Sequence, residues 1–69
     1  MTTMVYVIVQ YDEYWDGKKI LEVHDNIQHA RIKKQNYYKS LWERIEIDND
    51  PRLKKIWYEI EQVLFIQNN

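Results

Sequence analysis

The first third of the chain is rich in β-branched and aromatic residues, which is typical of β-strands. Residues 4–15 read MVYVIVQYDEYW and residues 18–24 read KKILEVH, with Asp16 and Gly17 between them. An Asp-Gly pair between two such runs favours a type I′ turn, because that turn needs positive φ at both central positions. The pattern predicts a β-hairpin over residues 4–24, in which Trp15 faces Lys18 and Val9 faces His24.

The middle of the chain has apolar residues at helical spacing, which predicts a helix over residues 26–44. Asp25 is the expected N-cap, and Gln28 three residues later completes a capping-box pattern. The expected buried stripe consists of Ile27, Ala30, Tyr37, Tyr38, Leu41, Trp42 and Ile45. Residues 46–50 are acidic and polar, which favours a loop.

The last third of the chain fits two elements. As a helix, it would have Asp50 as N-cap and Pro51 at the first position, where proline is favoured. As a strand over residues 56–66, it would use a run dominated by Ile, Trp, Tyr, Val and Phe without alanine. Residue spacing favours the helix and residue types favour the strand, so local pattern leaves both open.

A resemblance bears on this segment. Val5-Tyr6-Val7, a Tyr/Asp-rich hairpin, one capped helix and the closing run YEIEQV of residues 58–63 resemble small uncharacterised bacterial and phage domains of β-β-α-β order. In those domains the last segment is a strand that returns beside the first. The resemblance implies one α+β domain over residues 1–69, with a small three-stranded antiparallel sheet packed on one helix (ββαβ). The alternative is ββαα, with a helical C-terminal segment.

Composition limits the interactions that can stabilise this domain and the cellular locations in which we expect it. The 69 residues include no cysteine but three Trp, six Tyr and one Phe, so stability must come from apolar packing or from association. The net charge of −1 disfavours a general binder of nucleic acid or anionic membrane. No apolar run approaches the roughly 18 residues of a membrane helix. The N-terminus lacks signal-peptide character, so we expect a cytoplasmic protein, in the host cytoplasm if phage-encoded.

Residues that could support catalysis or metal binding do not form a recognisable motif. His24 and His29 flank Asp25, a set that fits at most a weak surface metal site, because zinc needs at least three converging protein ligands and no cysteine joins them. Ser40, the only serine, lacks a glycine elbow and assignable triad partners. Residues 48–50 resemble the opening of a calcium loop, but its later glycine and glutamate are missing or shifted. We predict no enzymatic activity and no cofactor.

Apolar side chains on both sheet faces point to a binding function, since one helix covers only one face of a small sheet. Large exposed apolar patches usually mark interaction surfaces, and Tyr and Trp are favoured anchors there. We therefore predict a protein partner or a homodimer at this surface. The predicted interface residues are Tyr6, Ile8, Asp12, Glu13, Tyr14, Trp15, Leu21, Val23, Trp57, Val63 and Phe65.

The leading functional prediction is a small protein-binding module. Its specific form is a phage or mobile-element inhibitor that binds a host protein, such as a defence protein, stoichiometrically. One alternative is a nucleotide or small-molecule sponge at a subunit interface, with Arg31, Lys34 and Tyr38 as ligands. Another is nucleic-acid binding through the basic helix, which the acidic balance elsewhere disfavours.

Overall fold

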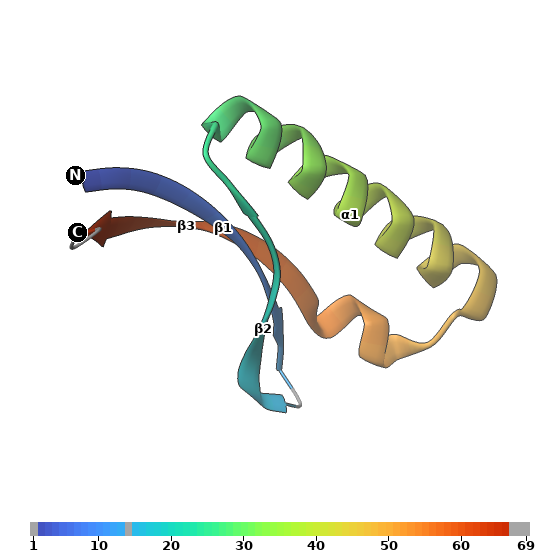
Figure 1. Cartoon of the computed structure of the whole chain (residues 1–69). Coiled ribbons are helices and arrows are strands. Elements are labelled where there is room, and N and C mark those ends of the chain that lie inside the picture. The colour runs from blue at the N-terminus through green and yellow to red at the C-terminus, as the bar shows by residue number, and fades with distance from the viewer. Residues whose placement is uncertain (1, 14, 67–69) are drawn as a thin grey trace.

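The computed structural model describes the backbone of residues 2–13 and 15–66 and the side chains of residues 3–13 and 17–65. Its elements are β1 (Thr2–Asp12), β2 (Trp15–His24), α1 (Ile27–Asp48), the short 3₁₀ helix η1 (Pro51–Lys55) and β3 (Ile56–Ile66). The strands form one antiparallel sheet in the order β2-β1-β3, with α1 and η1 on the same side of it (Figure 1). The predicted ββαβ fold of the α+β class is confirmed, and the ββαα alternative is wrong.

The C-terminal segment combines both elements that its sequence allowed. Asp50 caps η1 by accepting a hydrogen bond from the Arg52 N–H at 3.0 Å, and Pro51 occupies the first turn. This helix ends after five residues. The chain then enters β3, which pairs with β1 along its whole length, from Ile56 opposite Asp12 to Ile66 opposite Thr2. Pairing with a distant strand therefore decided what local propensity left open.

The hairpin turns earlier than the Asp-Gly pair predicts. Asp12 pairs with Trp15, so the chain reverses between them, and Gly17 lies within β2 without a positive φ. The predicted pairing of Trp15 with Lys18 is therefore wrong. The reason is tertiary: the Glu13 N–H donates to the Lys55 carbonyl at 3.1 Å, which fixes the end of β1 against η1.

A second irregularity in β2 changes which side chains share a face. Ile8 pairs with Glu22 while Val9 pairs with Ile20, so Leu21 is an extra residue in β2. Such a β-bulge shifts the alternation of side chains along the strand. The predicted pairing of Val9 with His24 is wrong because the earlier turn shifts the register of β2, so His24 pairs with Tyr6.

The helix is longer than predicted and begins one residue later. Asn26, not Asp25, is the N-cap, because its side chain accepts from the backbone N–H groups of Gln28 and His29. The helix continues to Asp48, where residues 46–50 were expected to form a loop. Asn49 ends it in the left-handed conformation, which asparagine tolerates better than most residues.

The core lies between α1 and the sheet. Ile8 of β1, Ala30 of α1 and Tyr58 of β3 are buried there, and Leu41 packs with Tyr58 and with Leu53 of η1. Trp42 was expected on the buried stripe of the helix, but it is exposed. The described Cα atoms span 50 × 26 × 12 Å, so the molecule is thin and one sheet face has no helix over it.

Candidate functional site

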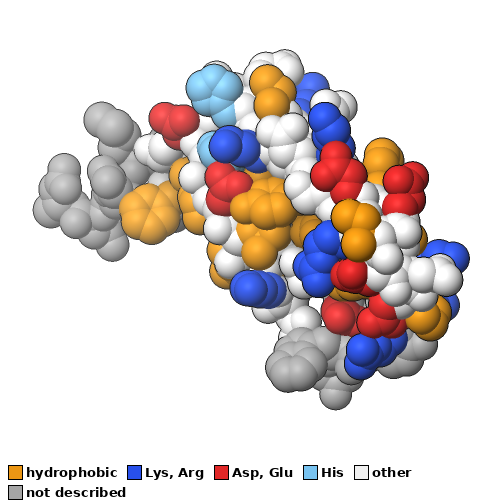
Figure 2. Space-filling model, turned by 90° about the vertical axis from the view of Figure 1, so that its right-hand side faces the viewer, with side chains coloured by type: hydrophobic (Ala, Val, Ile, Leu, Met, Phe, Trp, Pro, Cys, Tyr) orange, Lys and Arg blue, Asp and Glu red, His pale blue; other side chains and the backbone are white. Residues whose placement is uncertain are grey.

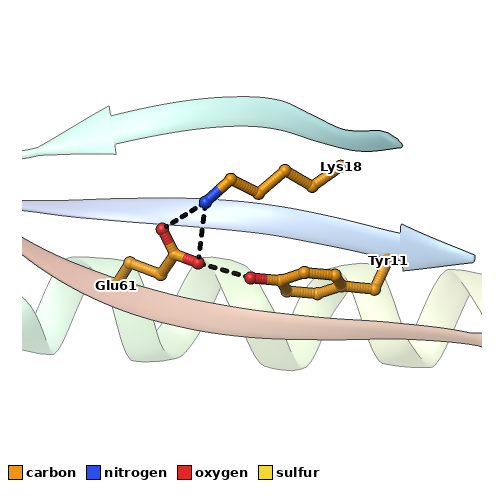
Figure 3. A network of polar contacts seen from close by, with 3 residues as sticks. All are labelled: Tyr11, Lys18 and Glu61. Carbon is orange, nitrogen blue, oxygen red and sulfur yellow. Dashed lines mark hydrogen bonds and ion pairs between the residues drawn. The ribbon is translucent and has the colours of Figure 1, made fainter. Parts of the chain in front are cut away.

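The sheet face turned away from α1 carries the candidate binding surface. Tyr11 and Trp57 lie opposite each other on adjacent strands, and their rings stack at 5.3 Å between centroids. Figure 3 views Tyr11 with α1 behind the strands, and Figure 1 shows the helices on that other side of the sheet only. We call it the open face. Its exposed apolar side chains, 40% to 63% accessible, are Ile20, Val23, Trp57, Val63 and Phe65.

At the centre of the open face, neighbouring side chains cover one another. Val7 and Val9 lie on this face in the central strand, yet both are buried. Val7 has Val23 on one side and a glutamate on the other, and Val9 lies opposite Ile20. The exposed apolar surface is therefore contributed by the two outer strands, where it can meet another molecule.

The accessible surface of the chain is large for its mass. It amounts to 5655 Å² for 8.6 kDa, whereas the usual scaling for folded monomers gives about 4700 Å². The difference of about 950 Å² is close to the roughly 800 Å² that each partner buries in a standard interface. The chain therefore exposes more surface than a compact monomer of its mass, in keeping with its thin shape.

A polar network crosses the open face between its apolar ends (Figure 3). The Tyr11 hydroxyl donates a hydrogen bond to Glu61, and Lys18 Nζ lies 3.1 Å from Glu61 Oε2. The hydrogen bond to Glu61 raises the pKa of Tyr11 to about 12, and the same bond together with Lys18 lowers the pKa of Glu61. Each group therefore holds the other in its neutral-pH state, Tyr11 protonated and Glu61 ionised.

The substitution Glu61→Gln is expected to lower the pKa of Tyr11 from about 12 toward its ordinary value of 10.0, because it removes the main cause of the shift. Glu59→Gln is the matched control, since Glu59 acts on Tyr11 only through charge and is the weakest cause. Tyrosinate absorbance during an alkaline titration measures both variants. An equal effect of the two substitutions would contradict the assigned hydrogen bond.

The same shift sets an alkaline limit on stability. A tyrosine whose folded-state pKa is raised stabilises the fold below pH 10, and this contribution is lost as the pH rises to about 12. Tyr37 acts in the same direction, because its hydrogen bond to Glu22 raises its pKa to about 12. The melting temperature is therefore expected to fall across this window, less steeply in Tyr11→Phe.

A second polar cluster lies on the helix side of the sheet. The Tyr37 hydroxyl donates to Glu22 Oε2 at 2.5 Å, and His24 Nε2 lies 3.1 Å from Glu22 Oε1. A hollow of about 210 Å³ beside it is lined by Glu22, Lys33, Asn36, Tyr37 and Ser40. The Tyr37 hydrogen bond lowers the pKa of Glu22, away from neutrality. General acids and bases work best with a pKa near the operating pH, so this arrangement favours a structural role.

The structure divides the predicted interface residues between the two sides of the sheet. Val23, Trp57, Val63 and Phe65 lie on the open face as exposed side chains. The prediction is wrong for Ile8, which is fully buried under α1, whereas Leu21 packs against the core cluster and Tyr6 points to the helix side, both half-buried. Ile20 was not among the predicted interface residues, although plain alternation along β2 places it beside Val9, whereas Val23 reaches the open face only because of the bulge at Leu21.

The remaining predicted interface residues belong to the hairpin end. Glu13 is exposed and its carboxylate lies 3.3 Å from Lys55 Nζ. Asp12 is half-buried and contributes to a hollow at this end of the sheet. Tyr14 and the side chain of Trp15 lie outside the described residues. Of the predicted contact residues at the hairpin end, the structure therefore locates the side chains of Asp12 and Glu13 only.

The alternative ligand set lies on α1 at spacings of three and four residues, but its tyrosine hydroxyl is already bonded inside the fold. The Tyr38 hydroxyl donates a hydrogen bond to the Tyr58 carbonyl at 3.1 Å and accepts one from the Tyr58 N–H at 3.0 Å. It is therefore already used inside the fold both as a donor and as an acceptor. Arg31 is exposed and Lys34 is half-buried on the same helix. Figure 2 views the side where α1 lies and shows hydrophobic side chains in separate patches with charged ones between them.

No family model, curated protein or solved structure matches this chain. Within the described residues, α1 included, no helix is both long and apolar enough to span a membrane. The functional conclusion therefore depends on the geometry of the open face.

Proposed function

We propose that this chain is a non-enzymatic protein-binding module whose open face docks on a partner protein. The observation that carries the proposal is the row of exposed apolar side chains on a sheet face without a covering layer. Exposed apolar patches on a protein surface usually mark interaction sites. The excess accessible area described above has the magnitude of one standard interface.

Charge on the open face indicates the chemistry of the partner. Glu61 is paired with Lys18, whereas Glu59 is exposed and takes part in no ion pair within the described residues. Burying Glu59 without an opposite charge would be costly. The partner should therefore present apolar side chains together with a basic group opposite Glu59.

The specific form that we propose is stoichiometric inhibition of a host protein by a chain of phage or mobile-element origin. The resemblance to small bacterial and phage domains supports this form, as does a composition rich in Ile, Lys, Asn and Tyr that is typical of AT-rich coding sequence. Binding that covers a partner's functional surface requires no catalytic group on this chain.

Site-specific photo-crosslinking in bacterial cells tests the proposal. A photo-reactive amino acid at Val23 probes the open face, and one at Ile47, a highly exposed residue of α1, is the matched control. We expect one discrete product from Val23 and none from Ile47. The purified partner should then bind the chain at 1:1, and Ile20→Asp should weaken this binding at least about 10-fold, because it buries a charge in the contact.

Three outcomes would overturn the proposal. The two positions could crosslink equally, Val23 could give only a product at twice the 8.6 kDa mass of the chain, or Ile20→Asp could leave binding unchanged. Circular dichroism of Ile20→Asp shows whether the fold is retained. The exposed position of Ile20 makes retention the expected result.

A further inference from the structure

The two edges of the sheet differ in regularity. The ladder between β1 and β2 has irregularities after Ile8 and after Gln10, which bend and interrupt the β2 edge. The ladder between β1 and β3 has none over all 11 residues of β3. β3 also contains no proline and no lysine, the residues that commonly protect a sheet edge. A long and regular edge strand without bulge, proline or lysine favours pairing with another strand.

Backbone contacts show which residues of β3 point outward from the sheet. The N–H of Tyr58 donates to the Tyr38 hydroxyl instead of to β1, and the N–H of Ile56 donates to the Leu53 carbonyl. In an antiparallel ladder, residues alternate between bonding to one neighbour strand and bonding to the other. Because the ladder with β1 is regular, the next residues whose backbone N–H and C=O groups point to the free edge of the sheet are Ile60, Gln62 and Leu64.

These three outward positions are available. Outside the ladders, the backbone hydrogen bonds within the described residues do not involve Ile60, Gln62 or Leu64. The Tyr38 hydroxyl meanwhile satisfies both the N–H and the C=O of Tyr58, as a neighbouring strand would. Tyr38 therefore closes the edge at Tyr58, and an added strand can pair only from Ile60 onward.

We propose that a second copy of this chain adds its β3 to this edge, antiparallel, about a two-fold axis at Gln62. The product is a continuous six-stranded sheet whose open face extends across both copies. This inference goes beyond the proposed function, uses a different surface and does not depend on it.

The positions of the glutamates decide against two other registers. A two-fold axis at Ile60 would place Glu59 opposite Glu61 of the second copy, and an axis at Glu61 would place Glu61 opposite itself. Like charges directly opposite each other across strands are destabilising. With the axis at Gln62, the residues opposite Glu61 and Glu59 are Val63 and Phe65 of the second copy.

The side chains on the helix side favour Gln62 over axes farther along the strand. With the axis at Gln62, Ile60 lies opposite Leu64 of the second copy, and the two Gln62 amides face each other. An axis at Val63 would instead place each Gln62 amide opposite Leu64 of the second copy, so the two amides would lose the hydrogen bond that they can make to each other. Leu64 is more than half exposed in the single chain and would be covered in the pair.

Backbone blocking at Gln62 tests the edge contact. Gln62→Pro removes the outward N–H at the axis, and proline is tolerated in edge strands where the N–H faces away from the sheet. Sedimentation equilibrium should show a dimer for the native chain. The substitution deletes two backbone hydrogen bonds between the copies, so it should raise the dissociation constant of the dimer more than about 10-fold. Gln62→Ala, which keeps the N–H, is the matched control and should dimerise within about 3-fold of the native chain.

A charge exchange tests the register and does not require proline to be tolerated. Gln62→Lys and Gln62→Glu should each weaken the dimer by up to about 5-fold, because each places like charges opposite each other at the axis. An equimolar mixture should restore it as a heterodimer. The proposal is overturned if the native chain stays monomeric at concentrations well above micromolar, if Gln62→Pro dimerises as the native chain does, or if the mixture associates no better than either variant.

Discussion

Ile8→Ala is expected to lower the free energy of unfolding by about 2–5 kcal/mol, the usual cost of removing a large aliphatic side chain from a closed core. Ile8 lies in the central strand under α1 and is 0% exposed. A domain of this size has only a few kcal/mol of net stability, so the variant should be substantially unfolded at room temperature. Urea titration followed by circular dichroism measures the effect.

Ile20→Ala is the matched control for this prediction. It deletes the same atoms from a residue of the neighbouring strand that is 63% exposed on the open face. The expected loss is below about 1 kcal/mol, because little buried contact is removed. Similar losses for the two variants would show that the division of the sheet into a covered and an open face is wrong.

Tyr38→Phe is expected to destabilise the chain by about 1–3 kcal/mol, although it removes a single oxygen atom. The ring still packs against Tyr58, and its edge-on geometry at 5.0 Å is retained. The N–H and the C=O of Tyr58 lose their partner, however, and Tyr58 is only 8% exposed, so water replaces that partner poorly.

Tyr6→Phe is the control for the loss of a hydroxyl. Tyr6 is half-buried in β1, and no hydrogen bond of its hydroxyl is found within the described residues. Its substitution should change stability by less than about 0.5 kcal/mol in the same urea titration. If Tyr38→Phe is equally neutral, the hydroxyl does not close the edge of β3, and the assignment of the free edge positions must be revised.

Part of the candidate site was predictable from sequence. Trp57, Val63 and Phe65 alternate along one strand, and Val5, Val7 and Val9 alternate along another, so an apolar face on each strand follows from the period of two alone. The excess of apolar surface over what one helix covers also follows from these counts. The sequence could not tell which of the two faces the helix covers, and it contains no signal for the bulge at Leu21, which turns Val23 to the open face.

The sequence by itself determined that this chain has a strand-rich start, one amphipathic helix and a closing apolar segment, because composition and periodicity act over a few residues. The tertiary structure alone decided where the hairpin turns, that residues 56–66 are a strand, and which face of the sheet stays open. These features depend on strand register, which is set by contacts between distant segments such as Glu13 with Lys55. A shift of one residue in register moves every side chain of a strand to the opposite face, so local pattern cannot fix it.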